Sequence, residues 1–493
     1  MHQKITTLGR LKESGWRSVS IKDELRKNLI NKIKANEPVF PGILGYDKTV
    51  IPQIQNAILA RHDLILLGLR GQAKTRILRM LVTFLDDFIP VVEGSEINDD
   101  PLNPISIYSK NLIAQHGDDT PITWLPREKR YGEKLATPDT TVSDLIGDLD
   151  PIKAASMKKA LSDEEVINYG LIPRTNRGIF VINELPDLQP RIQVALLNIM
   201  QERDIQIRGF NIRIPIDVFM AFSANPEDYT NRGNIITPLK DRIDSQIITH
   251  YPKSVDIAMK ITSQEAWVDR SNELEIHIPD SYRKILEYVA FEARDSEYID
   301  QKSGVSTRMT ITAMEQVISA AERRAVHSST DKTSVRITDL YAMVPALTGK
   351  LELVYEGEQE GAVNVAKHII GKAVNKVFKE FFPDPMKRKG DEESPYKEIL
   401  GWFEKGNILE VPDLADDLTY QKKLDSVGGL KDLAKTYCKD TKDLYAIMDL
   451  LIEALHQNSK IGKNDLDDNR TYSDMLGSML GNMTDFDDDD FIA

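Results

Sequence analysis

The stretch LILLGLRGQAKTRIL carries residue types that can bind phosphate groups. Gly68 and Gly71 have no side chains to block the loop, so backbone N–H groups can turn toward phosphate oxygens. Lys74 can reach the β- and γ-phosphate oxygens of a nucleotide, and Thr75 can offer its hydroxyl to Mg²⁺. The apolar run 64–67 and the helical pattern after the loop supply the strand, loop and helix that such a site requires. We therefore predict a phosphate-binding loop over residues 68–75.

One position of this loop departs from the pattern GxxxxGK[ST], because Ala73 stands where the last glycine is usual. Alanine can adopt the same conformation if its φ is negative, so we expect an effect on nucleotide affinity and not on the identity of the motif. We expect Ala73 and Arg76 to bind the cofactor, ATP, together with the rest of the loop. Taken alone, the motif also fits an ordinary glycine-containing loop with a solvated lysine.

A second apolar run ends in polar residues. RTNRGIFVINELPDL has four apolar residues before Asn183 and Glu184, which predicts a core strand with polar groups at its carboxyl end. Ligands of open α/β sheets bind at that edge. Glu184 can accept a proton from the water that attacks a γ-phosphate. Asn183, where an aspartate is usual, can hydrogen-bond a Mg²⁺-bound water but adds no charge, which predicts weaker Mg²⁺ retention or slow turnover. A strand-end turn with an incidental acid is the alternative.

A third apolar run, in VFMAFSANPED, ends just before an amide. Val218 to Phe222 are apolar, and Asn225 precedes Pro226, which stops the strand. An amide at the tip of a neighbouring strand can orient the attacking water. We therefore predict that Asn225 senses the γ-phosphate side of the site.

These runs belong to an alternation of strand-like and helical stretches from Phe40 to about residue 252. The alternation predicts a parallel sheet covered by helices, with strands at 63–67, 89–92, 179–183 and 218–223. Between the second and third motifs, a helix over 190–202 precedes IQIRGFNIRI. Its isoleucines alternate around Arg208, Gly209 and Phe210, which predicts a β-hairpin, either a specific insertion or an ordinary surface hairpin.

The segments outside this alternation define further domains. Leu25, Leu29 and Ile33 have helical spacing in a polar lead-in, and helical patterns recur over 255–269, 281–293 and 311–326. The end of the chain is acidic, with Met475, Leu476, Met479, Leu480 and Met483 at helical spacing before DFDDDDF, which fits a partner-docking segment or a solvated end. The expected domains are a helical lead-in (1–38), an α/β ATP-binding core (39–252), a helical lid (253–350), a helical C-terminal region (351–463) and an acidic tail (464–493).

Composition restricts the function classes. The chain has 493 residues, of which 41% are hydrophobic and 28% charged, with a formal net charge of −14. This composition predicts two or three globular domains, and scattered basic residues make general nucleic-acid binding an unfavoured function. Cys438 is the single cysteine, so no intramolecular disulfide is expected. No apolar run has the length of a signal peptide core or a membrane span, so we expect a cytoplasmic protein with no membrane span.

From about Phe40 to Val326, these motifs and their order resemble the magnesium chelatase I subunit and MoxR branch of the AAA+ family. FPGILGYD is similar to the segment that packs on adenine, which places Ile43 among the cofactor-binding residues. VVEGSEINDDP and LATPDTTVSDLIGDLD resemble the chelatase stretches ahead of the acid strand, and the hairpin matches the helix-two insertion of this clade. The resemblance implies an α/β fold, namely an AAA+ P-loop parallel sheet sandwiched by helices, with an all-α lid and a further helical C-terminal region.

The same resemblance implies two further catalytic residues. Arg242, in LKDRI, matches the arginine that reaches the ATP of the adjacent subunit, and Arg232 is a second candidate for that role. Arg308, in SGVSTRMTI, matches the second sensor at the start of a lid helix. An exposed helical arginine is the plain alternative for either.

The resemblance also implies a function. It predicts an ATP-hydrolysing homo-oligomeric ring, with a hexamer as the expected size, which remodels a partner bearing a von Willebrand A domain. The cofactors would be ATP and Mg²⁺. Magnesium insertion into a porphyrin is less favoured, because the likeness weakens after Val326. Other hypotheses are a transcription activator, although the GAFTGA loop is missing, a nucleic-acid translocase, and a nucleotide-binding scaffold with little turnover.

Overall fold

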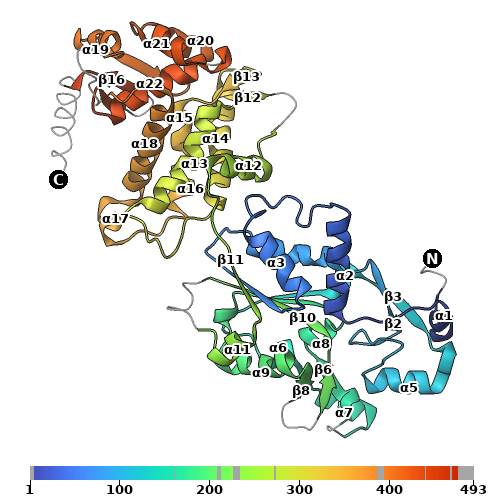
Figure 1. Cartoon of the computed structure of the whole chain (residues 1–493). Helices are drawn as coiled ribbons and strands as arrows, with labels where there is room; N and C mark the ends of the chain where they lie inside the picture. Colours follow the sequence, from blue (N-terminus) through green and yellow to red (C-terminus); the bar gives the residue numbers. More distant parts are fainter. Residues whose placement is uncertain are drawn as a thin grey trace. The chain divides into compact units, whose positions relative to one another are not determined.

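The computed structural model describes residues 5–160, 163–207, 212–225, 234–270, 274–385, 394–438, 440–466 and 469–475. The chain divides into two compact units, Met1–Tyr251 and Pro252–Ala493 (Figure 1). The division follows Tyr251, one residue before the end expected for the ATP-binding core. Each unit has a hydrophobic core of its own.

The first unit is built around a five-stranded sheet in the order β11-β1-β10-β7-β4, in which every pair of neighbours is parallel. The strands are β1 (Leu64–Leu67), β4 (Tyr131–Leu135), β7 (Gly178–Asn183), β10 (Val218–Ala224) and β11 (Ser245–Ile248). The three central strands are the continuous apolar runs of the sequence, as expected for strands that are covered on both faces. The predicted parallel α/β sheet is confirmed.

Helices cover both faces of this sheet (Figure 1). Along β7, Ile179 and Val181 point into one core with α2, α3 and α4, whereas Phe180 and Ile182 point into another with α9 and α11. This alternation follows from the two-residue period of a strand. The helices are α1 (Leu8–Glu13), α2 (Ile21–Lys34), α3 (Val50–Leu59), α4 (Lys74–Met80), α5 (Ile107–His116), α6 (Val142–Leu145), α7 (Pro151–Met157), α8 (Leu171–Arg174), α9 (Pro190–Gln201) and α11 (Thr237–Arg242).

The strand expected at 89–92 does not join the parallel sheet. It is β2 (Phe88–Val92), which pairs antiparallel with β3 (Ile122–Pro126) in a separate ribbon. The places at the two edges of the main sheet are taken by β4 and β11, which the apolar pattern did not indicate. Edge strands have one neighbouring strand and more exposed side chains, so they lack the continuous apolar run of a central strand.

The helical lead-in is packed into the first unit. Leu25 and Leu29 of α2 are buried in the core that α2 shares with α3 and α4. Glu24 of the same helix forms a bidentate ion pair with Arg130, with N–O distances of 2.7 and 2.6 Å, and both side chains are buried. A buried pair of this kind is strongly destabilised by loss of either partner. Helix α2 is therefore an integral part of this unit's structure.

The predicted hairpin is present at its base. β8 (Asp204–Gln206) pairs antiparallel with β9 (Arg213–Pro215), and Ile205 faces Ile214 across the pair. Both isoleucines are buried beneath α9. The tip with Arg208, Gly209 and Phe210 lies outside the described residues. A similar antiparallel pair, β5 (Gly147–Leu149) with β6 (Ile167–Tyr169), lies within the segment before the acid strand.

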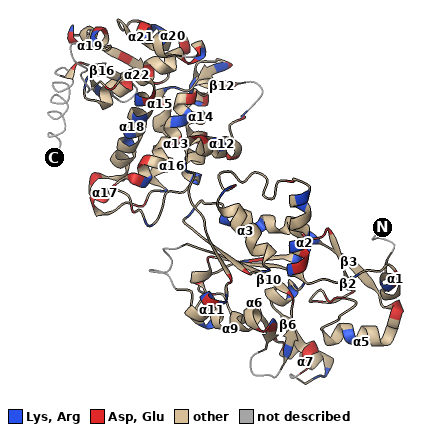
Figure 2. Ribbon diagram, viewed as in Figure 1, with Lys and Arg blue, Asp and Glu red and all other residues tan. Residues whose placement is uncertain are grey.

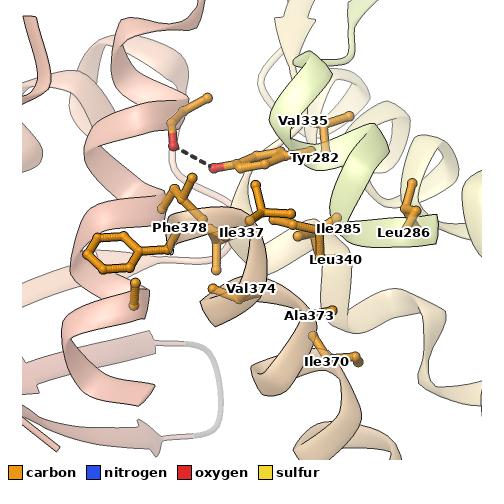
Figure 3. Close-up of a cluster of buried hydrophobic side chains, with 14 of the residues drawn as sticks. Tyr282, Ile285, Leu286, Val335, Ile337, Leu340, Ile370, Ala373, Val374 and Phe378 are labelled. Atoms are coloured by element: carbon orange, nitrogen blue, oxygen red, sulfur yellow. Dashed lines mark hydrogen bonds between the residues drawn. The ribbon is translucent and has the colours of Figure 1, made fainter. Parts of the chain in front are cut away.

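The second unit is mostly helical, as expected, and most of its helices share one core. Figure 3 shows part of this core, where Tyr282 donates a hydrogen bond of 2.9 Å to the carbonyl of Ala446 and apolar side chains of α13, α15 and α18 meet. The helices are α12 (Val255–Glu265), α13 (Asp280–Asp295), α14 (Arg308–His327), α15 (Ile337–Leu340), α16 (Val344–Thr348), α17 (Tyr355–Glu360), α18 (Ala362–Phe381), α19 (Lys397–Glu404), α20 (Asp417–Asp425), α21 (Leu430–Tyr437) and α22 (Leu444–Gln457).

Strands also occur in the second unit, where helices alone were expected. β12 (Glu275–His277) and β13 (Lys332–Ser334) form a parallel pair, and β14 (Leu409–Pro412), β16 (Asn469–Ser473) and β15 (Gly462–Leu466) form an antiparallel sheet. The tail expected from residue 464 therefore begins with paired strands. Tyr472 of β16 is buried and donates to Glu453 of α22 at 2.6 Å, a long-range contact that composition does not reveal. Residues 476–493, with most of the Met and Leu positions and the acidic run, lie outside the described residues.

Acidic and basic residues are interspersed along the elements of both units (Figure 2). Among the helices that the structure describes, none combines the length and apolarity needed to cross a bilayer.

Candidate functional site

The polar residues that follow the three central strands lie at one edge of the sheet. β1, β10 and β7 are parallel neighbours, with Leu67 opposite Ala224 and Phe222 opposite Ile182. The N–H of Gly68 continues this pairing with a 3.1 Å hydrogen bond to the carbonyl of Ala224. The glycine-containing loop, Asn225 and the pair Asn183 and Glu184 therefore start from adjacent strand ends.

The loop closes around the ammonium group of Lys74, the first residue of α4. This buried Nζ donates to the carbonyl of Gly68 and, at 3.0 Å, to the carbonyl of Leu69. Gly71 has a φ of 74°, in the left-handed region that glycine adopts without a steric cost. Thr75 is half-buried and Arg76 is exposed. The cationic residue of the motif is thus held inside the loop that the sequence predicted.

Side chains that sequence reasoning did not single out brace this loop. The hydroxyl of Thr249, just after β11, donates to the side chain of Gln72 at 2.6 Å. Tyr46 donates to the carbonyls of Gln72 at 3.1 Å and of His250 at 2.8 Å. Burial raises the pKa of Tyr46 to about 12, so this hydroxyl remains a donor. A Cβ at Gly68 would collide with Thr249 and Gln72, which explains this glycine. The sequence indicates these contacts only through Tyr46, which lies in the FPGILGYD block.

The conformation of Ala73 corrects the sequence-based expectation. Its φ is 57° and its ψ 14°, so it is left-handed, whereas a negative φ was expected. Gln72 is held through both its side chain and its carbonyl, and α4 begins at Lys74, so the single residue between them makes the turn. The left-handed conformation costs a residue with a Cβ about 1–2 kcal/mol, which explains why glycine is usual here.

Ala73→Gly should therefore leave the free energy of unfolding unchanged or raise it by up to about 1 kcal/mol, since relief of the left-handed conformation offsets the greater freedom of glycine in the unfolded chain. Ala155→Gly, at an exposed position within α7, is the matched control and should lower stability by about 1 kcal/mol. Denaturant unfolding of the full chain measures both changes. Equal losses in the two variants would contradict the left-handed turn.

Glu184 also has a left-handed backbone, with a φ of 54° and a ψ of 52°. It is half-buried, and its N–H donates to the hydroxyl of Ser223 on β10 at 3.2 Å. Left-handed residues other than glycine are strained, and such strain is concentrated at active sites and switch regions. The candidate base thus sits on a constrained turn at the edge of the sheet.

Asn183 is buried between two neighbouring strands. Its amide donates to Oε1 of Glu133 on β4 at 2.7 Å, and its Oδ1 accepts from the hydroxyl of Ser223 at 3.0 Å. Glu133 also accepts two hydrogen bonds from Arg79 of α4, at 2.8 and 2.9 Å. The bonds from Arg79 hold the pKa of Glu133 below its ordinary value, with smaller contributions from Tyr131 and Asn183. A carboxylate therefore lies beside Asn183, a feature that sequence reasoning missed because β4 was not recognised.

Three further candidates lie in the first unit. Asn225 is buried at the end of β10. Ile43 is a core residue that is 6% exposed and packs in the cluster with Phe40 and Val50. Arg242 ends α11 and donates to the side chain of Gln201 at 2.7 and 2.9 Å and to the carbonyl of Pro238.

Neither of the other two predicted arginines lies among the described residues of the first unit. Arg308 is the exposed first residue of α14 in the second unit. Arg232 lies outside the described residues. The structure thus brings together the loop, Asn183, Glu184 and Asn225.

Known proteins match part of this chain. Residues 156–248, from the segment before β6 to the end of β11, match the family model of the Sigma-54 interaction domain. The 38 kDa subunit of magnesium chelatase from Rhodobacter capsulatus is 27% identical over 233 residues, which cover 45% of this chain and 60% of that subunit. The corresponding subunit from Cereibacter sphaeroides is 25% identical over 242 residues, which cover 48% of this chain and 65% of that subunit.

A solved structure of the complex between the BchI and BchD subunits of magnesium chelatase is 18% identical, with a TM-score of 0.33, over 65% of this chain and 98% of that one. The matched region of the present chain thus spans 60% and 65% of the two chelatase subunits. The predicted resemblance to the AAA+ ATPases and to the magnesium chelatase I subunit is confirmed.

Proposed function

We propose that this chain is an ATP-hydrolysing AAA+ ring motor of the magnesium chelatase I and MoxR type that acts on a partner protein. The observation that carries the proposal is the convergence of a lysine-containing loop, an acid and an amide at the carboxyl ends of three adjacent parallel strands. Open α/β sheets bind their ligands at this edge. The relation to a chelatase subunit supports the AAA+ assignment.

The residues at this edge fit a magnesium nucleotide. Lys74 supplies a buried cation inside a loop whose backbone can approach phosphates at Gly68 and Gly71. Thr75 would offer its hydroxyl to Mg²⁺, and the second lone pair on Oδ1 of Asn183 would accept a hydrogen bond from a Mg²⁺-bound water. Protein sites for this ion need few direct ligands. When bound, Mg²⁺ neutralises charge on the β- and γ-phosphates.

The hydrolytic roles follow from position along the strand ends. Glu184 would accept the proton of the attacking water, and Asn225, at the end of β10 next to β7, would orient that water. Arg242 would stabilise the developing charge on the ATP of an adjacent subunit, and Arg308 would contact the γ-phosphate from the lid. This division of roles requires a homo-oligomeric ring, and a hexamer is the size we expect.

A protein with a von Willebrand A domain is the proposed partner, and the cytoplasm the proposed location. Support for a partner comes from the hairpin β8–β9, whose base is buried in the first unit and whose sequence resembles the helix-two insertion. A pull-down of the full chain with a candidate partner, with and without ATP, tests this part of the proposal. If the candidate does not bind either with or without ATP, that partner is rejected.

Transcription activation is a second candidate function, because residues 156–248 match the Sigma-54 interaction domain. The sequence has no GAFTGA motif in its hairpin, which weighs against this candidate. Nucleotide-dependent binding of purified sigma-54 by the full chain would favour it over the remodelling of another partner.

The nucleotide site is tested by Lys74→Ala. The substitution should weaken ATP binding by about ten- to hundredfold, since hydrogen bonds to charged groups contribute about 1.5–3 kcal/mol each. Calorimetric titration and phosphate release from the full chain measure binding and turnover. Lys110→Ala, at an exposed position on α5, is the control and should change neither. Unchanged affinity and turnover in the Lys74 variant would reject this site.

A further inference from the structure

A chain of hydrogen bonds connects the helix after the loop to the backbone of Glu184. Arg79 of α4 donates to Glu133 of β4, and the amide of Asn183 donates to the same carboxylate at 2.7 Å. The hydroxyl of Ser223 donates to Oδ1 of Asn183 at 3.0 Å. The N–H of Glu184 donates to that hydroxyl oxygen at 3.2 Å. The hydrogen bonds therefore run from α4 through side chains of β4, β7 and β10 to the backbone N–H of Glu184, the residue proposed as the base.

The strand register explains why these groups meet. Glu133 is paired with Val181, so its side chain shares a face of the sheet with Val181 and, two residues on, with Asn183. Ser223 lies on the same face of β10 as Ala221, which packs in the core beneath α4. Arg79 projects from α4 over this face. The hydrogen bonds therefore follow one face of the sheet from its edge strand inward.

The hydrogen bonds of Asn183 and Ser223 must be kept because both side chains are buried. Asn183 is 5% exposed and Ser223 is 1% exposed, so their polar groups cannot exchange these partners for bulk water. A buried donor or acceptor that loses its partner is strongly unfavourable. Glu133, whose side chain is 21% exposed, forms the outer end of this buried part.

The chemistry of each group sets the direction of the bonds. An ionised carboxylate only accepts hydrogen bonds, so Glu133 requires Asn183 to turn its NH₂ group outward along the sheet. The Oδ1 of Asn183 then faces Ser223 and accepts a hydrogen bond from its hydroxyl. The oxygen of Ser223 keeps a lone pair for the N–H of Glu184. An aspartate at position 183 would have no proton for Glu133 and would bring two carboxylates into direct repulsion.

We propose that Glu133 is a positioning residue of the hydrolysis site, which holds the left-handed backbone of Glu184 through Asn183 and Ser223. Asn183 is the neutral partner that Glu133 requires, which accounts for an amide where an aspartate is usual. The proposal rests on the proposed role of Glu184 in ATP hydrolysis. It concerns the geometry of the water-activating residue, so it predicts effects on turnover that are larger than effects on nucleotide affinity.

Exchange of the two side-chain types provides the test. Glu133→Ala removes the acceptor, and Asn183→Asp adds a repelling carboxylate. The double variant Glu133→Gln with Asn183→Asp restores the pair with its roles exchanged, so that position 133 donates and position 183 accepts. Two readouts are compared in the full chain. The first is ATP turnover, measured together with nucleotide affinity. The second is hydrogen–deuterium exchange of the peptide that spans residues 178–188.

Each single variant should lower kcat by about ten- to hundredfold, as expected for misplacement of a catalytic group, and change the affinity for a non-hydrolysable ATP analogue much less. Both should speed amide exchange in residues 178–188. The double variant should recover most of the turnover and the protection. Tyr131→Phe is the matched control, because its hydroxyl donates to Glu133 at 3.1 Å without lying on the path to Glu184. It should leave both readouts near the wild-type values.

A double variant no better than the single ones, in either readout, would overturn the proposal, as would single variants with wild-type exchange and turnover. Turnover of the wild-type chain tests the proposed function by itself. If the wild-type chain does not hydrolyse ATP, the proposed function fails, and the exchange pattern still decides whether Glu133 holds the Glu184 backbone.

Discussion

Replacing Glu184 by glutamine should lower the rate of ATP hydrolysis by about 10²- to 10⁴-fold, the contribution expected of a general base. Glutamine keeps the length and shape of the side chain but cannot accept the proton of the attacking water. The hydrogen bond to Ser223 uses the backbone N–H of Glu184, so this contact should survive the substitution. We therefore expect the turn between β7 and α9 to keep its conformation.

Nucleotide affinity separates this role from a structural one. Glu184→Gln should bind ATP as tightly as the wild-type chain and should retain it longer, which stabilises any ring that forms around ATP. Phosphate release and calorimetric titration measure the two quantities. Glu202→Gln, at the exposed end of α9, is the matched control and should leave both unchanged. Loss of ATP binding in the Glu184 variant, or turnover at the wild-type rate, would contradict the assignment of the base.

Arg242→Ala should lower turnover by about 10³- to 10⁵-fold if the guanidinium completes the site of an adjacent subunit, which is the range observed for arginine fingers. In this chain the guanidinium is held by Gln201 and by the carbonyl of Pro238. These contacts orient the side chain at the end of α11 and need not be lost when it engages an anionic phosphate. Arg26→Ala, which removes another arginine that donates to a backbone carbonyl, is the control.

Mixed assemblies test whether Arg242 acts between subunits. Arg242→Ala subunits retain Glu184, and Glu184→Gln subunits retain Arg242, so an interface between them can hold one complete site. A mixture of the two inactive variants should recover part of the turnover, with a maximum near equal proportions. Co-purification of differently tagged subunits shows that mixed assemblies form. Mixed assemblies without any recovery would reject the action between subunits.

The residue types in the sequence determined the three central strands of the sheet and the polar residues that follow them. β1, β7 and β10 are buried on both faces, so each is a continuous apolar run, and polar residues follow directly where the strand ends. Parallel strands end at the same edge, so recognition of three such runs was sufficient to predict that Lys74, Glu184 and Asn225 share an edge. The long helices α13 and α14 were predicted for a similar reason, since a one-sided apolar pattern depends on local spacing.

Tertiary structure alone decided the features that depend on contacts between distant residues. β4 is an edge strand with a polar pattern, so Glu133 could not be placed beside Asn183, 50 residues away along the chain. The contact between Gln72 and Thr249 spans 177 residues, and the left-handed turn at Ala73 follows from the way that contact holds the loop. Such contacts arise from the register and order of strands, which residue spacing within a single segment does not encode.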